Sequence, residues 1–147
     1  MNAVDTNVLI YAVDVLEPEK SQRAGQLLRQ LANDERPLVL PWQVAVEFMV
    51  CLRRWEEGGR ISRQDTETYL EQVILALPMV FPTSRILSLA LAMSTRYSVS
   101  HWDSLLLAAC LDAGVTTLYS EDFSHQAIYD SITVVNPFQQ VGDAPPR

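Results

Sequence analysis

The sequence predicts an α/β fold in which a short, mainly parallel sheet is flanked by helices. Short apolar segments alternate with helical patterns along the chain, which is the order of elements that βαβ units produce. The 147 residues suffice for one domain with a sizeable core. Because no internal repeat and no linker divides the chain, a single domain is expected.

Composition excludes several classes of protein. Hydrophobic residues make up 48% and charged residues 20% of the chain, an ordinary balance for a soluble domain. No apolar run reaches the ~18 to 20 residues of a membrane helix, and the N-terminus lacks the pattern of a signal peptide. A cytoplasmic protein with no membrane partner is therefore expected. Cys51 and Cys110 lie in helical patterns and are expected to be buried free thiols, in preference to a disulfide or a metal-binding pair.

The net charge of −7 disfavours a protein that holds nucleic acid on a broad basic face. An acidic cluster that binds divalent cations would contribute to this total, and bound metals would reverse the local charge. Four arginines crowd the junction between two predicted helices, namely Arg53, Arg54, Arg60 and Arg63. They are interpreted either as a solvated surface or as a contact for phosphate or an acidic partner.

The first half of the chain is expected to form two short strands and three helices, in the order strand 2–5, helix 8–13, helix 18–33, strand 37–40 and helix 41–57. Asp5 would end the first strand, and Thr6 or Asn7 would cap the short helix after it. Pro18 suits the first position of the next helix.

The second half is expected to continue this alternation, with helix 62–77, strand 78–81, helix 84–93, helix 103–113, strand 115–118 and an edge strand at 131–135. Ser62 opens a capping box, and Gly114 stops a helix. Residues 126–131 are expected to be irregular. Helix 84–93 is apolar nearly all round, which indicates either deep burial or a subunit contact.

Four acids lie at positions where this fold would bring them together. Asp5 and Asp122 each follow a predicted strand, and Asp103 opens a helix. Glu47 projects from the apolar face of helix 41–57 or from its edge, where an unpaired charge is costly. In parallel sheets the functional site lies beyond the carboxyl ends of the strands. One pocket could therefore hold all four carboxylates.

Each acid also has a purely structural interpretation. Asp5 could form an Asx turn, Asp103 could complement a helix N-terminus, and Asp122 could cap the segment after it. Glu47 could form a structural salt bridge. A joint site is favoured because one geometry explains all four residues.

A cluster of carboxylates implies a particular chemistry. Like charges at close range repel and raise pKa values unless protons or cations fill the site. Oxygen ligands without a cysteine or histidine pair suit Mg²⁺ or Mn²⁺. Such ions activate water and stabilise the charge of a phosphate. The sequence therefore predicts metal-assisted phosphodiester hydrolysis.

Two other chemistries were weighed against this one. His101 and His125 flank the acidic region and could run a metal-free acid–base ribonuclease that uses the 2′-hydroxyl, although surface or capping roles are favoured for both. A phosphatase of the halo-acid dehalogenase type needs a second aspartate two residues after Asp5. Asn7 occupies that position, so this interpretation is set aside.

Several segments together resemble a known family. They are Val4 to Tyr11, the internal Glu47, His101 to Ala109, Leu118 to Phe123 and Val134 to Phe138. In order and spacing they are similar to a PIN domain, and more narrowly to a VapC-type toxin of a toxin–antitoxin pair. The resemblance implies a PIN-like, Rossmann-like three-layer fold over residues 1–138. Residues 139–147 are expected to be a flexible tail, since the last six residues include two prolines.

The resemblance also implies an endoribonuclease that depends on Mg²⁺ or Mn²⁺. Asp5, Asp103 and Asp122 would hold the metal, and Glu47 would act as a further ligand or orient the water. Hydrolysis would leave a 5′-phosphate and a 3′-hydroxyl.

Neighbouring residues receive roles from the same resemblance. Asn7 and Ser120 would support the metal ligands by hydrogen bonds. Glu121 lies beside Asp122 and is the alternative ligand; Asp122 is preferred because it matches the family motif.

The resemblance further implies partners. They are an RNA substrate, often transfer RNA in the family, a VapB-like antitoxin that inhibits the toxin, and a second copy of the chain in a homodimer. Operator DNA would be contacted only through the antitoxin. The alternative function is a PIN module that binds RNA or protein without cleaving it.

Overall fold

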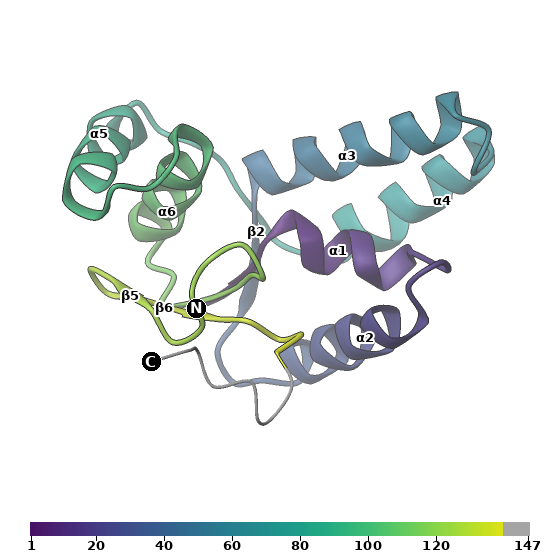
Figure 1. Ribbon diagram of the computed structural model, residues 1–147, viewed down its shortest axis with the longest axis horizontal. Helices are drawn as coiled ribbons and strands as arrows, with labels where there is room; N and C mark the ends of the chain where they lie inside the picture. Colours follow the sequence, from purple (N-terminus) through teal and green to yellow (C-terminus); the bar gives the residue numbers. More distant parts are fainter. Residues whose placement is uncertain (140–147) are drawn as a thin grey trace.

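The computed structural model describes residues 1–139, in which a sheet lies between two groups of helices (Figure 1). The sheet has six strands in the order β3-β2-β1-β4-β6-β5. They are β1 (Asn2–Val4), β2 (Leu38–Pro41), β3 (Met79–Val80), β4 (Thr117–Tyr119), β5 (Ile128–Tyr129) and β6 (Ile132–Val135). All neighbours pair in parallel except β5, which is antiparallel to β6. The predicted α/β fold class is confirmed.

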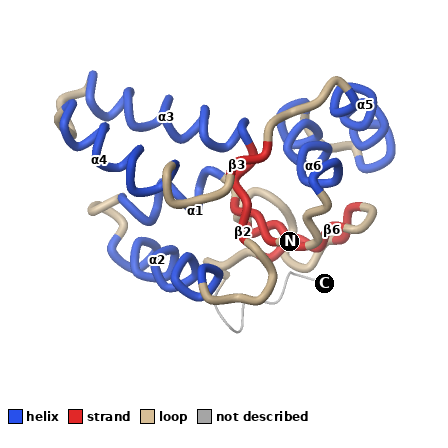
Figure 2. Tube along the Cα trace, turned by 180° about the vertical axis from the view of Figure 1, so that it is seen from behind, coloured by secondary structure: helices blue, strands red, loops and turns tan. Residues whose placement is uncertain are grey.

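Six helices cover the sheet. They are α1 (Thr6–Val13), α2 (Pro18–Ala32), α3 (Trp42–Glu57), α4 (Arg63–Ile74), α5 (Arg85–Tyr97) and α6 (His101–Ala113). Helices α1 to α4 lie on one side of the molecule and the α5–α6 pair on the other, as both views show (Figures 1 and 2). No helix within residues 1–139 is both long and apolar enough to cross a membrane.

The core forms where the helices pack on the central strands. All three residues of β1 are buried, as are Leu40 of β2 and Leu118 of β4. Phe48 of α3 is the largest fully buried side chain. Because β1 lies at the centre of the sheet, burial fixes its position and the position of the residues that follow it.

The N-terminal cap of α1 differs from the predicted one. Asp5 itself is the N-cap, and its side chain accepts a hydrogen bond from the backbone N–H of Thr6. The prediction that Thr6 or Asn7 caps this helix was wrong, because the aspartate one residue earlier already satisfies a free N–H of the first turn.

The predicted capping box and the predicted helix stop are confirmed. Ser62 and Asp65 form both hydrogen bonds of a capping box at the start of α4. Gly114 ends α6 with a φ of 78°, a left-handed conformation that a residue with a Cβ adopts only with strain. Helix α6 begins at His101, two residues earlier than expected, because Ser100 caps it.

The C-terminal part of the sheet corrects two expectations. Strand β6 is not an edge strand, since β5 pairs with its free side. Strand β5 lies in a segment expected to be irregular, at residues 126–131. Most of the predicted tail, beyond Gln139, lies outside the described residues.

Helix α5 is not deeply buried. Ile86, Ala90 and Met93 face the interior, whereas Leu87 and Leu91 are 66% and 73% exposed. Of the two interpretations of its apolar composition, deep burial was therefore wrong, and a subunit contact stays a prediction. Both cysteines are free, as expected; Cys110 is also buried as expected, whereas Cys51 is partly exposed, so the predicted burial of Cys51 was wrong.

Candidate active site

The register of two parallel strands places the first two site residues side by side. Val4, at the end of β1, pairs with Tyr119, at the end of β4. The next residues, Asp5 and Ser120, therefore leave the sheet at the same edge. The backbone N–H of Asp5 donates to the carbonyl oxygen of Tyr119 at 2.9 Å, which extends the pairing by one step.

Asp5 is buried, and both of its carboxylate oxygens accept hydrogen bonds. Its Oδ1 accepts from the backbone N–H of Thr6 at 2.7 Å, and its Oδ2 accepts from Oγ of Ser120 at 2.7 Å. Ser120 is fully buried and Asp5 is 5% exposed, so the hydrogen bond between them is largely shielded from solvent. The carboxylate has one fixed orientation at the N-terminus of α1, where the helix dipole favours negative charge.

The environment of Asp5 nevertheless disfavours its charge. Burial is the main cause that raises the pKa of Asp5 to about 6. The hydrogen bonds from Ser120 and Thr6 oppose this shift, while the charges of Asp122 and Glu47 add to it. A cation beside Asp5 would reverse the imbalance.

Asn7 joins Asp5 to Asp122. Its Nδ2 lies 3.4 Å from Oδ2 of Asp5, 3.4 Å from Oγ of Ser120 and 3.3 Å from Oδ2 of Asp122. The backbone N–H of Asp122 donates to Oγ of Ser120 at 3.1 Å. The Asn7 amide therefore contacts both carboxylates, and the Ser120 hydroxyl links the Asp5 carboxylate to the backbone of Asp122.

Glu47 approaches the same place from α3. Its Oε2 accepts from the hydroxyl of Thr6 at 2.9 Å, and its Oε1 accepts from Nε2 of Gln43 at 2.9 Å. Because Thr6 directly follows Asp5, the Glu47 carboxylate is hydrogen-bonded to the residue next to the buried aspartate. Within residues 1–139 Glu47 forms no ion pair, so the structure does not bear out the salt-bridge interpretation.

Asp103 lies in the first turn of α6, half-buried. Its backbone N–H donates to Oγ of the N-cap Ser100 at 3.2 Å. The pKa of Tyr129 is raised mainly by burial and additionally by the charge of Asp103. In the described part of the chain no hydrogen bond links the Asp103 carboxylate to the other three acids, and no group of three or more His, Cys, Asp or Glu side chains is arranged to hold a metal ion.

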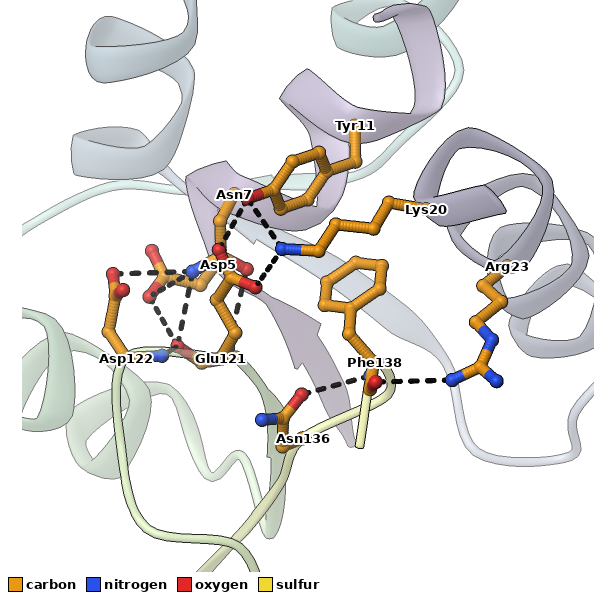
Figure 3. A network of polar contacts seen from close by, with 10 residues as sticks. Asp5, Asn7, Tyr11, Lys20, Arg23, Glu121, Asp122, Asn136 and Phe138 are labelled. Atoms are coloured by element: carbon orange, nitrogen blue, oxygen red, sulfur yellow. Dashed lines mark hydrogen bonds and ion pairs between the residues drawn. The ribbon is translucent and has the colours of Figure 1, made fainter. Parts of the chain in front are cut away.

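Glu121 points away from this cluster (Figure 3). Its Oε1 accepts from the hydroxyl of Tyr11 at 2.7 Å, and its Oε2 forms an ion pair with Nζ of Lys20 at 3.1 Å. Lys20 also donates to the Tyr11 hydroxyl at 3.0 Å. Glu121 thus has two partners of its own, whereas Asp122 faces Asn7.

Several of these residues were not found from the sequence. Gln43 and Tyr11 carry a usable signal, because Gln43 is four residues before Glu47 and Tyr11 is four after Asn7, the spacing of neighbours on a helix face. Thr6 and Lys20 carry none, since their partners lie 41 and 101 residues away.

The histidines take structural positions. Nδ1 of His125 accepts the backbone N–H of Asn136 at 3.1 Å. The ring of His101 is exposed and packs edge-on against Trp102, with centroids 4.9 Å apart. Neither ring has a hydrogen bond to the four acids within residues 1–139.

The fold and this geometry define a class of protein: an α/β domain with a small, mainly parallel sheet and carboxylates gathered beyond its strand ends. The family model described as "PIN domain" matches residues 3–130. The chain belongs to the PIN domain family, as its opening and closing motifs indicated. No curated protein matches it significantly.

Three solved structures share the fold at low sequence identity. A toxin–antitoxin complex from Klebsiella pneumoniae has a TM-score of 0.67 at 18% identity, covering 95% of this chain and 100% of its own. VapBC2 from Rickettsia felis, bound to a DNA fragment from its promoter, has 0.66 at 12%, covering 90% and 96%. Mycobacterium tuberculosis VapC20, a toxin that cleaves the sarcin–ricin loop, has 0.59 at 14%, covering 80% and 87%.

Proposed function

We propose that this protein is the toxin of a toxin–antitoxin pair, an endoribonuclease that hydrolyses RNA phosphodiester bonds with the help of Mg²⁺ or Mn²⁺. The observation that carries the proposal is the position of Asp5 in a PIN domain. It is 5% exposed, its pKa is raised to about 6, and the charges of Asp122 and Glu47 act on it. A cluster of this kind needs a positive charge, and it lies where α/β sheets place their sites.

The donor set fits a hard divalent cation. Asp5, Asp103 and Asp122 are the proposed ligands, with Glu47 as a further ligand or as the group that orients the attacking water. All these donors are carboxylate oxygens, which Mg²⁺ and Mn²⁺ prefer. A bound ion would activate a water and offset the charge of the scissile phosphate.

The surrounding residues would keep the acids in position. Thr6 and Ser120 fix both oxygens of Asp5, and Asn7 holds Asp122 beside it. Gln43 and Thr6 direct Glu47 toward the same space. Hydrogen bonds of this kind orient ligands and tune their affinity for metal.

The contacts of Glu121 support Asp122 as the ligand of this pair. Glu121 is engaged by Tyr11 and Lys20, and turning it into the cluster would break an ion pair at 3.1 Å. Asp122 already shares Asn7 with Asp5. We therefore assign Asn7 and Ser120 as supporting residues and Glu121 to a structural pair.

The partners follow from the family and the shared fold. Two of the similar structures are of toxins with their antitoxins, one of them on promoter DNA, and a third similar protein cleaves an RNA loop. For this chain we propose an RNA substrate, possible targets including transfer RNA, and a VapB-like antitoxin that contacts operator DNA. A homodimer in the cytoplasm completes the proposal.

Cleavage of RNA tests the proposal. Purified, antitoxin-free protein is incubated with total bacterial RNA in Mg²⁺, Mn²⁺ or EDTA, beside Asp103→Asn. We expect discrete products with 5′-phosphate and 3′-hydroxyl ends that require metal and Asp103. Loss of one essential carboxylate should lower the rate at least about 100-fold.

Asp112→Asn is the matched control. Asp112 lies on the same helix as Asp103, but its carboxylate accepts a hydrogen bond from Thr83 and is not one of the four site acids. Cleavage by folded Asp103→Asn, or equal cleavage in EDTA, contradicts the proposal. RNA binding without any metal-dependent product would favour the alternative, a PIN module that binds and does not cut.

A further inference from the structure

A groove of about 790 Å³ lies between α3 and the α5–α6 pair, the two helical groups separated in Figure 1. Its walls are one face of α3, the link between β3 and α5, and the facing sides of α5 and α6. Of its lining residues, Glu47 is expected from the sequence to be a site acid, and Arg54 is among the four arginines interpreted as a solvated surface or a phosphate contact, but none of the aromatic residues is expected from the sequence to be a binding residue. We call it the α3–α6 groove.

The α3–α6 groove opens directly beside the candidate active site. Thr6 and Glu47, which are hydrogen-bonded to each other, both line it. Nε2 of Gln43 bridges Glu47 and the carbonyl oxygen of Trp102, at 2.9 and 3.2 Å, and so ties the two walls together at this end. A ligand that lies in the groove therefore reaches Glu47 of the candidate site.

Three aromatic side chains line the groove and are largely exposed. Trp42, Phe81 and Trp102 are 45%, 67% and 64% exposed. The rings of Trp42 and Phe81 lie 5.5 Å apart and are tilted by 32°. Exposed ring faces beside a polar site are the usual platform for unpaired nucleic acid bases, and each stacked base contributes about 1 to 3 kcal/mol.

A cation lies farther along the groove. Arg54 lines it twelve residues after Trp42, which is about 18 Å along α3. Three other arginines of this region are engaged in ion pairs: Arg53 with Glu57, Arg60 with Asp14 and Arg63 with Glu56. Within residues 1–139 Arg54 forms no ion pair, so it can contact a phosphate.

We propose that the α3–α6 groove binds an unpaired segment of RNA, with bases on the aromatic side chains and a phosphate at Arg54. The inference rests on the proposed function and names its substrate class: a single-stranded or loop region next to the cleaved bond. Bases inside a duplex have no free face to stack on Phe81 or Trp102, so paired RNA is excluded.

A second copy of the chain is the other occupant that an apolar groove could take. It would have to bury Arg54 and Glu47, and an unpaired buried charge costs several kcal/mol. RNA supplies a phosphate for Arg54, and its scissile phosphate needs the carboxylate site. The charges in the groove therefore favour RNA.

Binding of a defined probe tests the proposal. The probe is a fluorescein-labelled 12-nucleotide RNA without self-complementarity, titrated in Mg²⁺ and compared with the same strand in a full duplex. Asp103→Asn is the background, and a gel verifies that the RNA stays intact. We expect the single strand to bind more tightly than the duplex.

Variants locate the binding site. Phe81→Leu and Trp102→Leu keep apolar bulk but remove the ring, and each should weaken binding about 5-fold to 150-fold. Phe81→Tyr should bind as the parent does. Leu91→Ala is the control, because Leu91 is exposed on α5 but does not line the groove.

Salt dependence tests the role of Arg54. Arg54→Gln should lower the slope of log affinity against log salt by about 0.7, the contribution of one phosphate of a single strand. Arg53→Gln is the matched control, since Arg53 is next to Arg54 in the sequence but pairs with Glu57 and lies outside the groove. Equal slopes for the two variants would contradict the assignment.

The outcomes also separate this inference from the proposed function. It is overturned if the single strand does not bind, if the leucine variants bind unchanged, or if sedimentation shows that they dissociate a dimer. In the last case the groove is a contact between two copies. Failure of the wild-type protein to cleave any RNA, with the binding pattern intact, would instead overturn the nuclease proposal alone.

Discussion

The surroundings of Asp5 in the folded protein favour the protonated form of its carboxyl group. Its pKa is raised from 3.8 to about 6, first by burial. The folded state therefore binds a proton more tightly than the unfolded chain. This contribution to stability is fully present below pH ~4 and is lost as the pH rises through ~6.

Asp5→Asn should therefore stabilise the metal-free protein at high pH. Two pKa units correspond to about 3 kcal/mol, so we expect a gain of up to about 3 kcal/mol at pH 8 and no gain at pH 3.5. The amide oxygen can still accept from Thr6, and the amide NH₂ can donate to Ser120. Urea denaturation in EDTA at both pH values measures the effect.

The exposed Glu35→Gln serves as the control for Asp5→Asn and should show no such difference between the two pH values. A lower stability of Asp5→Asn than of wild type at pH 8 would mean that the hydrogen bonds outweigh the cost of burial. The pKa of Asp5 would then not be raised.

For single residues, the sequence identifies the acids, and the structure identifies the hydrogen-bond partners that hold them. Asp5 and Asp122 are visible because strand ends can be read from apolar runs. The partners of Glu121 are not visible, because Lys20 lies 101 residues away and only the packing of α2 beside α1 brings it close. Choosing between Glu121 and Asp122 from residues alone was therefore impossible.

At the scale of the elements, helix α3 supplies Glu47 to the site. Its buried face fixes the helix against the sheet, and Glu47 projects beside that face toward Thr6. The strength of this packing decides how precisely Glu47 is placed. Phe48, the next residue, is fully buried.

Phe48→Ala should lower the free energy of unfolding by about 3 to 5 kcal/mol, because it leaves a cavity in the core. Met49→Ala, one residue further and 40% exposed, should change it by less than about 1.5 kcal/mol. Urea denaturation of both variants checks the pair. Similar values for the two would show that α3 does not pack on the sheet as described.

The sequence predicts the long elements well but misses strand β5. The helices have caps, a glycine stop and apolar spacing, which are local signals. Strand β5 has two residues, and its turn to β6 through Asp130 and Ser131 lacks the Asn-Gly or Asp-Gly pair that marks a hairpin. Asp130 takes a φ of 52° there, so the turn forms without its usual residues.

For the whole molecule, the order of strands brings together strands that are far apart in the sequence. Strands β1 and β4 are neighbours although more than 100 residues separate them, so the site forms only when the sheet closes. Parallel alternation predicts that strand ends share one edge, but not which strands are neighbours. The order of the strands was therefore not predicted from the sequence.

The same architecture leaves one face of α5 and the α3–α6 groove open. Neither follows from periodicity, since the apolar pattern of α5 is equally compatible with a core helix. Exposed Leu87 and Leu91 keep a subunit contact as a prediction for this helix, while the groove beside it has charges that suit RNA.

Calorimetric titration of Mn²⁺ into antitoxin-free protein tests most directly whether the carboxylates form one metal site. Wild type should bind, Asp122→Asn should bind at least about tenfold more weakly, and Glu121→Gln should bind as wild type does. Equal affinity of wild type and Asp122→Asn, or a loss of binding in Glu121→Gln alone, would contradict the account.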